Sequence, residues 1–383
     1  MLVIITSAIS AVADEGTAGP DLQSPTENAV AAAEISTLLK QLNSPGFAER
    51  QQATAALLGL DVDSAPTLNA LRKNLNPETR QRLAAILQRL HRRWFDRKLQ
   101  QLQQTDGEEV AATFPDWHAF QQSTAEPDEA LMIFQELIQA EQELFTCRLF
   151  DPERVPLVLE TRAKVLESHC NGSDSEQFPV TQAAALMLIA SNEEVQLLRG
   201  TSYYISRCFD DERFSQLLRT GKYSGELQQL CNRWILRPRI APDRPLLFAM
   251  QHQLPAGRDL ALRVLSERRR GPRVFHAAMA LSVLGDKQDL PFLESLFADN
   301  TVIWPPAGNT GTESDTSSLR LQVRDAALLA ACHLRGIAPG EIGLSPEPAP
   351  ETLYQINTVG FATDDAREQS VQQYQNLLQD RDQ

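Results

Sequence analysis

The chain has 383 residues, of which 42% are hydrophobic and 6% aromatic. This length allows two or three domains, or one extended structure of stacked helices. Small helices rich in Ala and Leu fit the composition better than sheets do. The formal net charge of -14 argues against general nucleic-acid binding, which needs an excess of Lys and Arg to meet the phosphates. We therefore expect no nucleic-acid partner.

The first residues predict an export signal. An apolar run from Leu2 to Val12 ends in the sequence Ala11-Val12-Ala13, which is typical of a signal peptidase site. No Lys or Arg precedes this run, so either the natural start lies a few codons upstream or the segment is only an apolar tail. We favour export to the periplasm or cell envelope. In this interpretation residues 1–13 are a signal peptide, 14–33 are a disordered linker, and the mature chain has no transmembrane span.

Residues 34–104 are expected to form helices of a repeat-like kind. Apolar residues recur three and four positions apart from Ile35 to Leu42, and a second helix is expected to open at Phe47. Asn76, Pro77 and Glu78 predict the start of a long helix, because Asn caps, Pro needs no amide partner there, and Glu meets the positive dipole end. Asp61, by contrast, is interpreted as a turn and cap rather than part of a cation loop.

The middle of the chain is less regular. Residues 105–127 contain Gly, Pro and several acids, and they predict an acidic linker that touches a neighbour through its aromatic side chains. Residues 128–243 predict an irregular helical section. Within it, 183–190 is an apolar helix of small residues that suits a crowded core position.

The C-terminal part shows the most regular pattern. Apolar residues recur at helical spacing over 276–284, 290–299 and 323–331, and such stripes are buried only if the helices stack. This defines a repeat section over 244–335 with an inserted loop at 300–320. The loop contains Trp304, which either folds against its own helices or contacts a partner. Residues 336–383 predict a Pro- and Gly-containing tail and a capping helix.

These features resemble HEAT repeats, which belong to the armadillo-type helical folds. A helix with an early Pro, Pro291, and a terminal Asp, Asp299, leads into a helix that opens with Val323 and Arg324. Similar units occur at both ends of the chain. The resemblance implies an all-α fold, a right-handed α-solenoid of HEAT-like helix pairs with an irregular helical middle section, of the kind found in exported bacterial proteins.

Charge is strongly segregated along the chain. Residues 72–98 hold nine Lys or Arg against two acids, and 99–147 hold ten acids without any Lys or Arg. A second basic block covers 219–273, with twelve Lys or Arg against four acids. Either these charges lie on helix faces that attract one another within the fold, or they form an electropositive groove for an acidic partner. The candidate partner-binding residues are Arg268, Arg269, Arg270, Arg273 and Trp304.

The sequence predicts no catalytic, cofactor-binding or metal-binding residue, and we expect no cofactor. The six histidines lie far apart, and no nucleophile or phosphate-loop motif occurs. The five cysteines allow two interpretations. They are buried thiols, or the pairs Cys147/Cys170 and Cys208/Cys231, each 23 positions apart, form disulfides.

The leading interpretation is a non-catalytic scaffold of the cell envelope that binds another, acidic protein. The alternative is an enzyme or enzyme subunit, because lyases that attach bilin chromophores are also built from HEAT-like repeats and a fold does not fix a function. A third interpretation is a structural role in the envelope.

Overall fold

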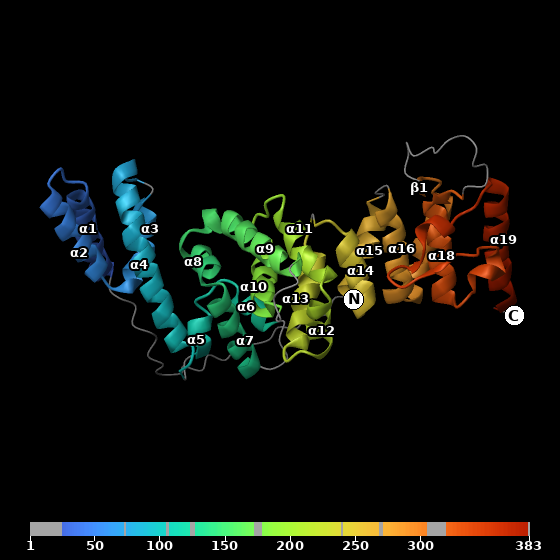
Figure 1. Cartoon of the computed structure of the whole chain (residues 1–383), viewed down its shortest axis with the longest axis horizontal. Coiled ribbons are helices and arrows are strands. Elements are labelled where there is room, and N and C mark those ends of the chain that lie inside the picture. The colour runs from blue at the N-terminus through green and yellow to red at the C-terminus, as the bar shows by residue number, and fades with distance from the viewer. Residues whose placement is uncertain are drawn as a thin grey trace, which may run out of the picture. The chain divides into compact units, whose positions relative to one another are not determined.

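The computed structural model describes residues 25–72, 74–104, 107–122, 127–171, 178–238, 240–267, 271–304 and 319–381 (Figure 1). Nineteen α-helices account for most of these residues, joined by short 3-10 turns and four strands of two or three residues. The prediction of an all-α fold is therefore confirmed. The predicted signal peptide and residues 14–24 of the predicted linker lie outside the described residues, whereas residues 25–33, predicted as disordered, are helical.

The chain divides into two compact units, residues 1–94 and 95–383. The first unit contains α1 (Pro25–Leu42), α2 (Phe47–Gly59), α3 (Ala65–Arg72) and the first part of α4 (Pro77–Gln101). Helices α1 and α2 pack against each other. The core of this unit is made of leucines and other aliphatic residues at helical spacing, among them Leu39, Leu42, Leu57, Leu68 and Leu83.

Polar side chains fix the helix starts in the first unit, as the sequence predicts. Oδ1 of Asn76 accepts a hydrogen bond from the backbone N of Thr79 at 2.9 Å, which is the expected cap of α4. The amide of Asn76 also donates to Oδ1 of Asn43 at 2.7 Å, so the turn after α1 is bound to the start of α4. Asp61 caps the 3-10 turn η1 (Val62–Ser64) by accepting from the backbone N of Asp63. Both features were predicted correctly.

The second unit begins with an aromatic core. Helices α5 (Gly107–Ala111) and α6 (Trp117–Gln121) precede α7 (Pro127–Ala140) and α8 (Gln142–Phe150). The rings of Phe95, Phe114, Phe134 and Phe145 meet edge to face, with centroids about 6 Å apart. Residues 107–121 are thus a folded layer rather than an acidic linker, because their aromatic side chains are buried in this core.

The next helices surround a fully buried one. They are α9 (Val155–Asn171), α10 (Val180–Ser191), α11 (Thr201–Ser206), α12 (Glu212–Thr220) and α13 (Ser224–Leu236), with the turn η3 (Arg207–Asp210) between α11 and α12. All residues from 183 to 190 in α10 are buried. This helix contacts α7, α9 and α13, so the prediction of a small-residue helix in a crowded core is confirmed.

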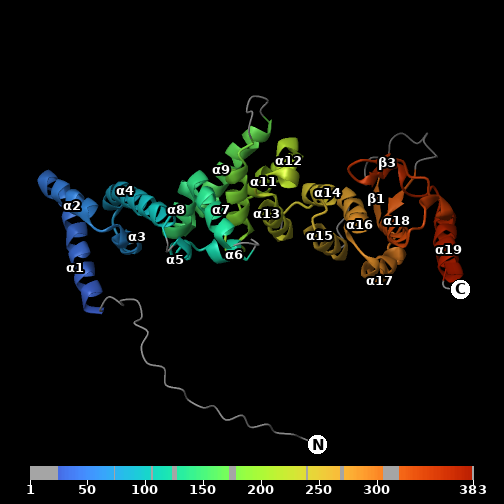
Figure 2. The same cartoon turned by 90° about the horizontal axis from the view of Figure 1, so that it is seen from below.

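The remaining helices pack mainly on their neighbours along the chain. They are α14 (Asp243–His252), α15 (Ala256–Ser266), α16 (Pro272–Leu284), α17 (Leu290–Ser295), α18 (Val323–Arg335) and α19 (Asp364–Arg381). Figures 1 and 2 show α15, α16, α18 and α19 following one another, and each of these contacts the next. Gly257 on α15 allows this helix to pack closely against both α14 and α16. A Cβ at this position would lie only 2.5 Å from Ala249 of α14 and from Leu284 of α16.

Two small antiparallel ribbons connect the last helices. Strand β1 (Val302–Trp304) lies within the predicted loop 300–320 and pairs with β2 (Leu321–Gln322), which follows the loop directly. Residues 305–318 of the loop lie outside the described ranges. Strand β3 (Pro348–Ala349) pairs with β4 (Leu353–Tyr354) in the predicted Pro- and Gly-containing tail. The last predicted helix is confirmed as α19, which begins at Asp364.

Candidate functional site

Of the predicted partner-binding residues, the structure describes Arg273 and Trp304. Arg268, Arg269 and Arg270 lie outside the described residues. Arg273 lies in the first turn of α16 and is half-buried, and Trp304 ends β1, half-buried and paired with the backbone of Leu321. Within the described ranges, no hydrogen bond, ion pair or ring contact joins Arg273 to Trp304.

Arg273 belongs to a charged group at the start of α14. Nδ1 of His276 lies 3.4 Å from Oδ1 of Asp243. The interaction with His276, followed by the charge of Arg273, lowers the pKa of the Asp243 carboxyl despite its partial burial. The charge of Arg273, which the sequence analysis assigned to a partner, thus acts on a carboxylate of the same chain.

Many Arg side chains of the second basic block, residues 219–273, bind groups within the chain. Arg258 forms a two-pronged ion pair with the buried Asp289, at 2.8 and 2.7 Å. Arg233 donates to the backbone O of Ala119 at 2.6 Å, and Arg237 donates to that of Val195 at 2.6 Å. Arg219 and Arg263 also have partners within the chain. For these residues, the structure favours attraction within the fold over an open electropositive groove.

A polar cleft of the second unit lies between η3, α12, α14 and the β3–β4 turn. Its volume is about 440 Å³. The cleft lies against an aromatic stack in which the rings of Phe209 and Phe248 are 4.1 Å apart and almost parallel, at 10°. Carboxylates of Asp210, Glu212 and Glu351 line the walls, opposed by the single guanidinium of Arg244. The lining is therefore net acidic.

Ion pairs hold the rim of this cleft in place. Asp210 accepts from Arg207 at 2.5 Å and from Arg244 at 2.8 Å. The guanidinium of Arg244 also lies 5.2 Å from the ring centroid of Tyr203, which is 45% exposed. Arg244, which lines the cleft, therefore makes a cation–π contact with Tyr203 and shares the carboxylate of Asp210 with Arg207.

One side-chain pair at the cleft resembles a nucleophile and its base. Oγ of Ser215, which lines the cleft, is 3.1 Å from Nε2 of His252. Burial, with the charge of Arg219, lowers the pKa of His252 and so favours the neutral imidazole. Ser215 is 2% exposed. Among the described residues, none forms a hydrogen bond with Nδ1, the other ring nitrogen of His252. The third group of a catalytic triad, which would orient the ring, is therefore not seen in these residues.

The cysteines are five free thiols, four of them buried and Cys170 partly exposed. The sulfurs of Cys170 and Cys208 lie 4.0 Å apart, at the end of α9 and in η3. This is neither of the pairs that the sequence suggested. The two cysteines are 38 positions apart, and their contact depends on how α9 packs against η3. The spacing in the sequence therefore could not predict this pair.

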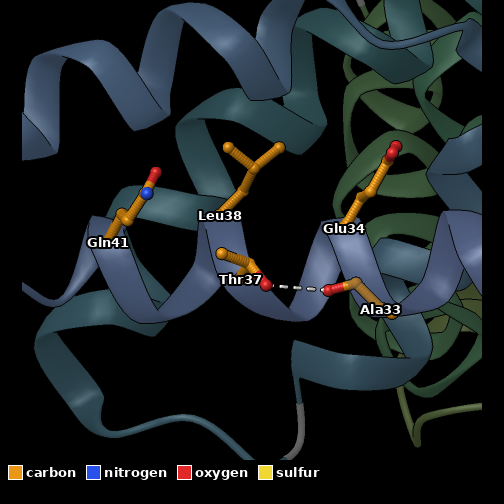
Figure 3. A pocket seen from close by; sticks show the side chains of 5 residues that line it. All are labelled: Ala33, Glu34, Thr37, Leu38 and Gln41. Atoms are coloured by element: carbon orange, nitrogen blue, oxygen red, sulfur yellow. Dashed lines mark hydrogen bonds between the residues drawn. The ribbon is translucent and has the colours of Figure 1, made fainter.

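Two shallow hollows lie on the first unit. One, of about 440 Å³, follows a single face of α1, where Figure 3 shows Glu34, Leu38 and Gln41 along one side of the helix. The other, of about 520 Å³, lies between α2 and α4 beside Phe47, whose ring is 67% exposed and lies below the guanidinium of Arg50. Arg50 also donates to the backbone O of Ser44 and Pro45, so it stabilises the turn that precedes α2.

The part of the chain that the structure describes holds neither a metal cluster nor a membrane span. Across those ranges, no group of three or more His, Cys, Asp or Glu side chains lies together as a metal site would. None of the helices in the same ranges is both long enough and apolar enough to cross a membrane. Comparison of the chain with protein families, with curated proteins and with solved structures finds no match.

Proposed function

We propose that the chain is a non-catalytic scaffold of the cell envelope that binds another protein. Its helices form a right-handed α-solenoid of HEAT-like pairs, and the chain reaches the envelope by export. The observation that carries this proposal is the serial packing of the second unit. Helix α7 contacts α10, which contacts α13, and the series continues through α15, α16, α18 and α19. Helices that pack in series leave extended lateral faces free for a partner.

The partner-binding surface that we propose lies where α15 leads into α16. It comprises Arg268, Arg269 and Arg270, with Arg273 and the Trp304 of the neighbouring ribbon. Helix α16 contacts β1, which supports a common surface. Arg side chains in this number favour an acidic partner, because a guanidinium pairs with carboxylates through two hydrogen bonds.

The test of this function is affinity capture with the chain from Asp14 onward as bait in an envelope extract of the source cell. The variant R268E/R269E/R270E is compared with a control of the same charge change, R89E/R92E/R199E. The control residues are exposed. A partner that binds the natural chain and the control but not the first variant, and binds again as a purified protein, supports the proposal. Equal capture by all three baits would show that this surface does not bind the partner.

A second function, catalysis, has one observation in its favour, the contact between Ser215 and His252 at the cleft. An enzyme of this kind would lose its activity in the variant S215A. A chromophore or metal bound to the purified chain, seen in its absorption spectrum, would also favour the enzyme over the scaffold.

A further inference from the structure

We propose that Cys170 and Cys208 are a reversible disulfide site whose oxidation fixes one wall of the acidic cleft. The two thiols belong to different elements, α9 and η3, which pack against each other. Formation of the bond needs the sulfurs to approach from 4.0 Å to ~2.05 Å, a movement of about 2 Å. This inference rests on geometry and is independent of the proposed scaffold function.

The two thiols differ in exposure and in the direction of their pKa shifts. Cys170 is partly exposed at the last turn of α9, whereas Cys208 is buried. The hydrogen bond between the two thiols lowers the pKa of Cys170, and the charges of Arg207 and Arg213 act in the same direction. Burial raises the pKa of Cys208 well above its usual value. Cys170 is therefore the attacking thiol, and Cys208 is the resolving one.

The oxidant is a small-molecule disulfide, such as oxidised glutathione. The thiolate of Cys170 attacks one sulfur of this disulfide, forms a mixed disulfide and releases one thiolate, which takes up the proton that Cys170 lost. Cys208 loses its proton and attacks Sγ of Cys170, which releases the second small thiol. Two protein thiols and one disulfide thus give one protein disulfide and two small thiols, with two electrons passed to the oxidant.

The surroundings link this bond to the cleft. Cys208 is followed directly by Phe209 and Asp210, which line the cleft. On the other side, Arg213 donates to the backbone O of His169 at 2.9 Å and pairs with Asp211, so the end of α9 is already bound to the start of α12. A covalent bond between α9 and η3 would restrict the same segment that carries the cleft wall.

The test uses the purified full chain, first reduced and then treated with oxidised glutathione. Free thiols are blocked with N-ethylmaleimide under denaturing conditions, counted by mass spectrometry and assigned by peptide mapping. We expect two of the five thiols to be lost, with one link between Cys170 and Cys208 that dithiothreitol reverses. Hydrogen exchange over residues 207–215 should be slower in the oxidised chain. Five blocked thiols, or a link between Cys208 and Cys231, would overturn the proposal.

Two variants separate the steps. In C208S the resolving thiol is absent, so we expect one glutathione to accumulate on Cys170. In the control C147S the disulfide should form as in the natural chain. The mapping of the natural chain needs no variant, so the result stands even if C208S folds poorly. A C208S chain that takes up no glutathione would show that Cys170 does not attack.

Discussion

Arg367 on α19 and Asp325 on α18 form an ion pair that is almost completely removed from solvent. Nε of Arg367 lies 2.6 Å from one carboxylate oxygen of Asp325, and a terminal nitrogen lies 3.1 Å from the other. The side chains are 3% and 0% exposed. Asp325 also accepts from the backbone N of Gln322 at 2.9 Å. One carboxylate therefore caps α18 and holds α19 on it.

Removal of Arg367 should therefore be costly. In R367A the carboxylate of Asp325 stays buried without its partner, which costs about 3 to 5 kcal/mol of unfolding free energy. Urea unfolding of the full chain, followed by circular dichroism, measures this loss. The matched control is R219A, because Arg219 and its partner Glu212 are 51% and 74% exposed, and such a pair contributes less than about 1 kcal/mol. Equal losses in both variants would contradict the role of the buried pair.

Gly257 tests how closely the helices of the series approach. Helix propensity alone would make G257A more stable, but the added Cβ meets Ala249 and Leu284 at 2.5 Å. We expect a loss of about 1 to 3 kcal/mol from this overpacking. Gly225 in α13 is exposed, and a Cβ added there would meet no atom within 4 Å, so G225A should gain about 0.4 to 1 kcal/mol. Thermal unfolding of the two variants should therefore shift in opposite directions.

The aromatic core of the second unit gives a third prediction. Phe114 is 1% exposed and its ring meets those of Phe95, Phe134 and Phe145. Replacement by Ala leaves a cavity and should cost about 3 to 5 kcal/mol. In the control L157A, the side chain is 59% exposed, and the change should stay within about 0.5 kcal/mol. A small effect of F114A would mean that this segment is a linker after all.

The fourth prediction concerns pH. Burial, with the charge of Arg219, lowers the pKa of His252 in the folded chain below the unfolded value of about 6.5. The unfolded chain then binds more protons between the two pKa values, so the contribution of His252 to stability is present above about pH 6.5 and is lost as the pH falls through the folded pKa. In H252Q this part of the acid sensitivity should disappear. Melting temperatures at pH 7.5 and pH 5.5 check the difference, and an unchanged pH dependence in H252Q would contradict it.

Local signals in the sequence predicted local structure well. The cap at Asn76, the turn at Asp61 and the buried helix at 183–190 were all predicted from residue types and spacing, because neighbours along the chain decide these features. The linker predicted at 105–127 was wrong for residues 107–121, although contact through its aromatic side chains was expected, because these side chains are buried and decide the fold of the segment.

The candidate cleft and the thiol pair could not be predicted from the sequence. Asp210, Arg244 and Glu351 come from three elements far apart in the chain, and their meeting depends on tertiary packing. The same is true of Cys170 and Cys208. The basic block gave a strong signal, yet charge counts do not distinguish Arg258, which pairs with a buried carboxylate, from an Arg that faces a partner.

The most direct test of the scaffold is a binding measurement with the partner that affinity capture identifies. Isothermal titration calorimetry compares the natural chain, R268E/R269E/R270E and the control R89E/R92E/R199E at the same ionic strength. We predict that the first variant binds at least about tenfold more weakly, equal to about 1.4 kcal/mol, with an unchanged melting temperature, while the control binds as the natural chain does. Equal affinity of all three chains, or a parallel loss of stability in the first variant, would contradict the proposed surface.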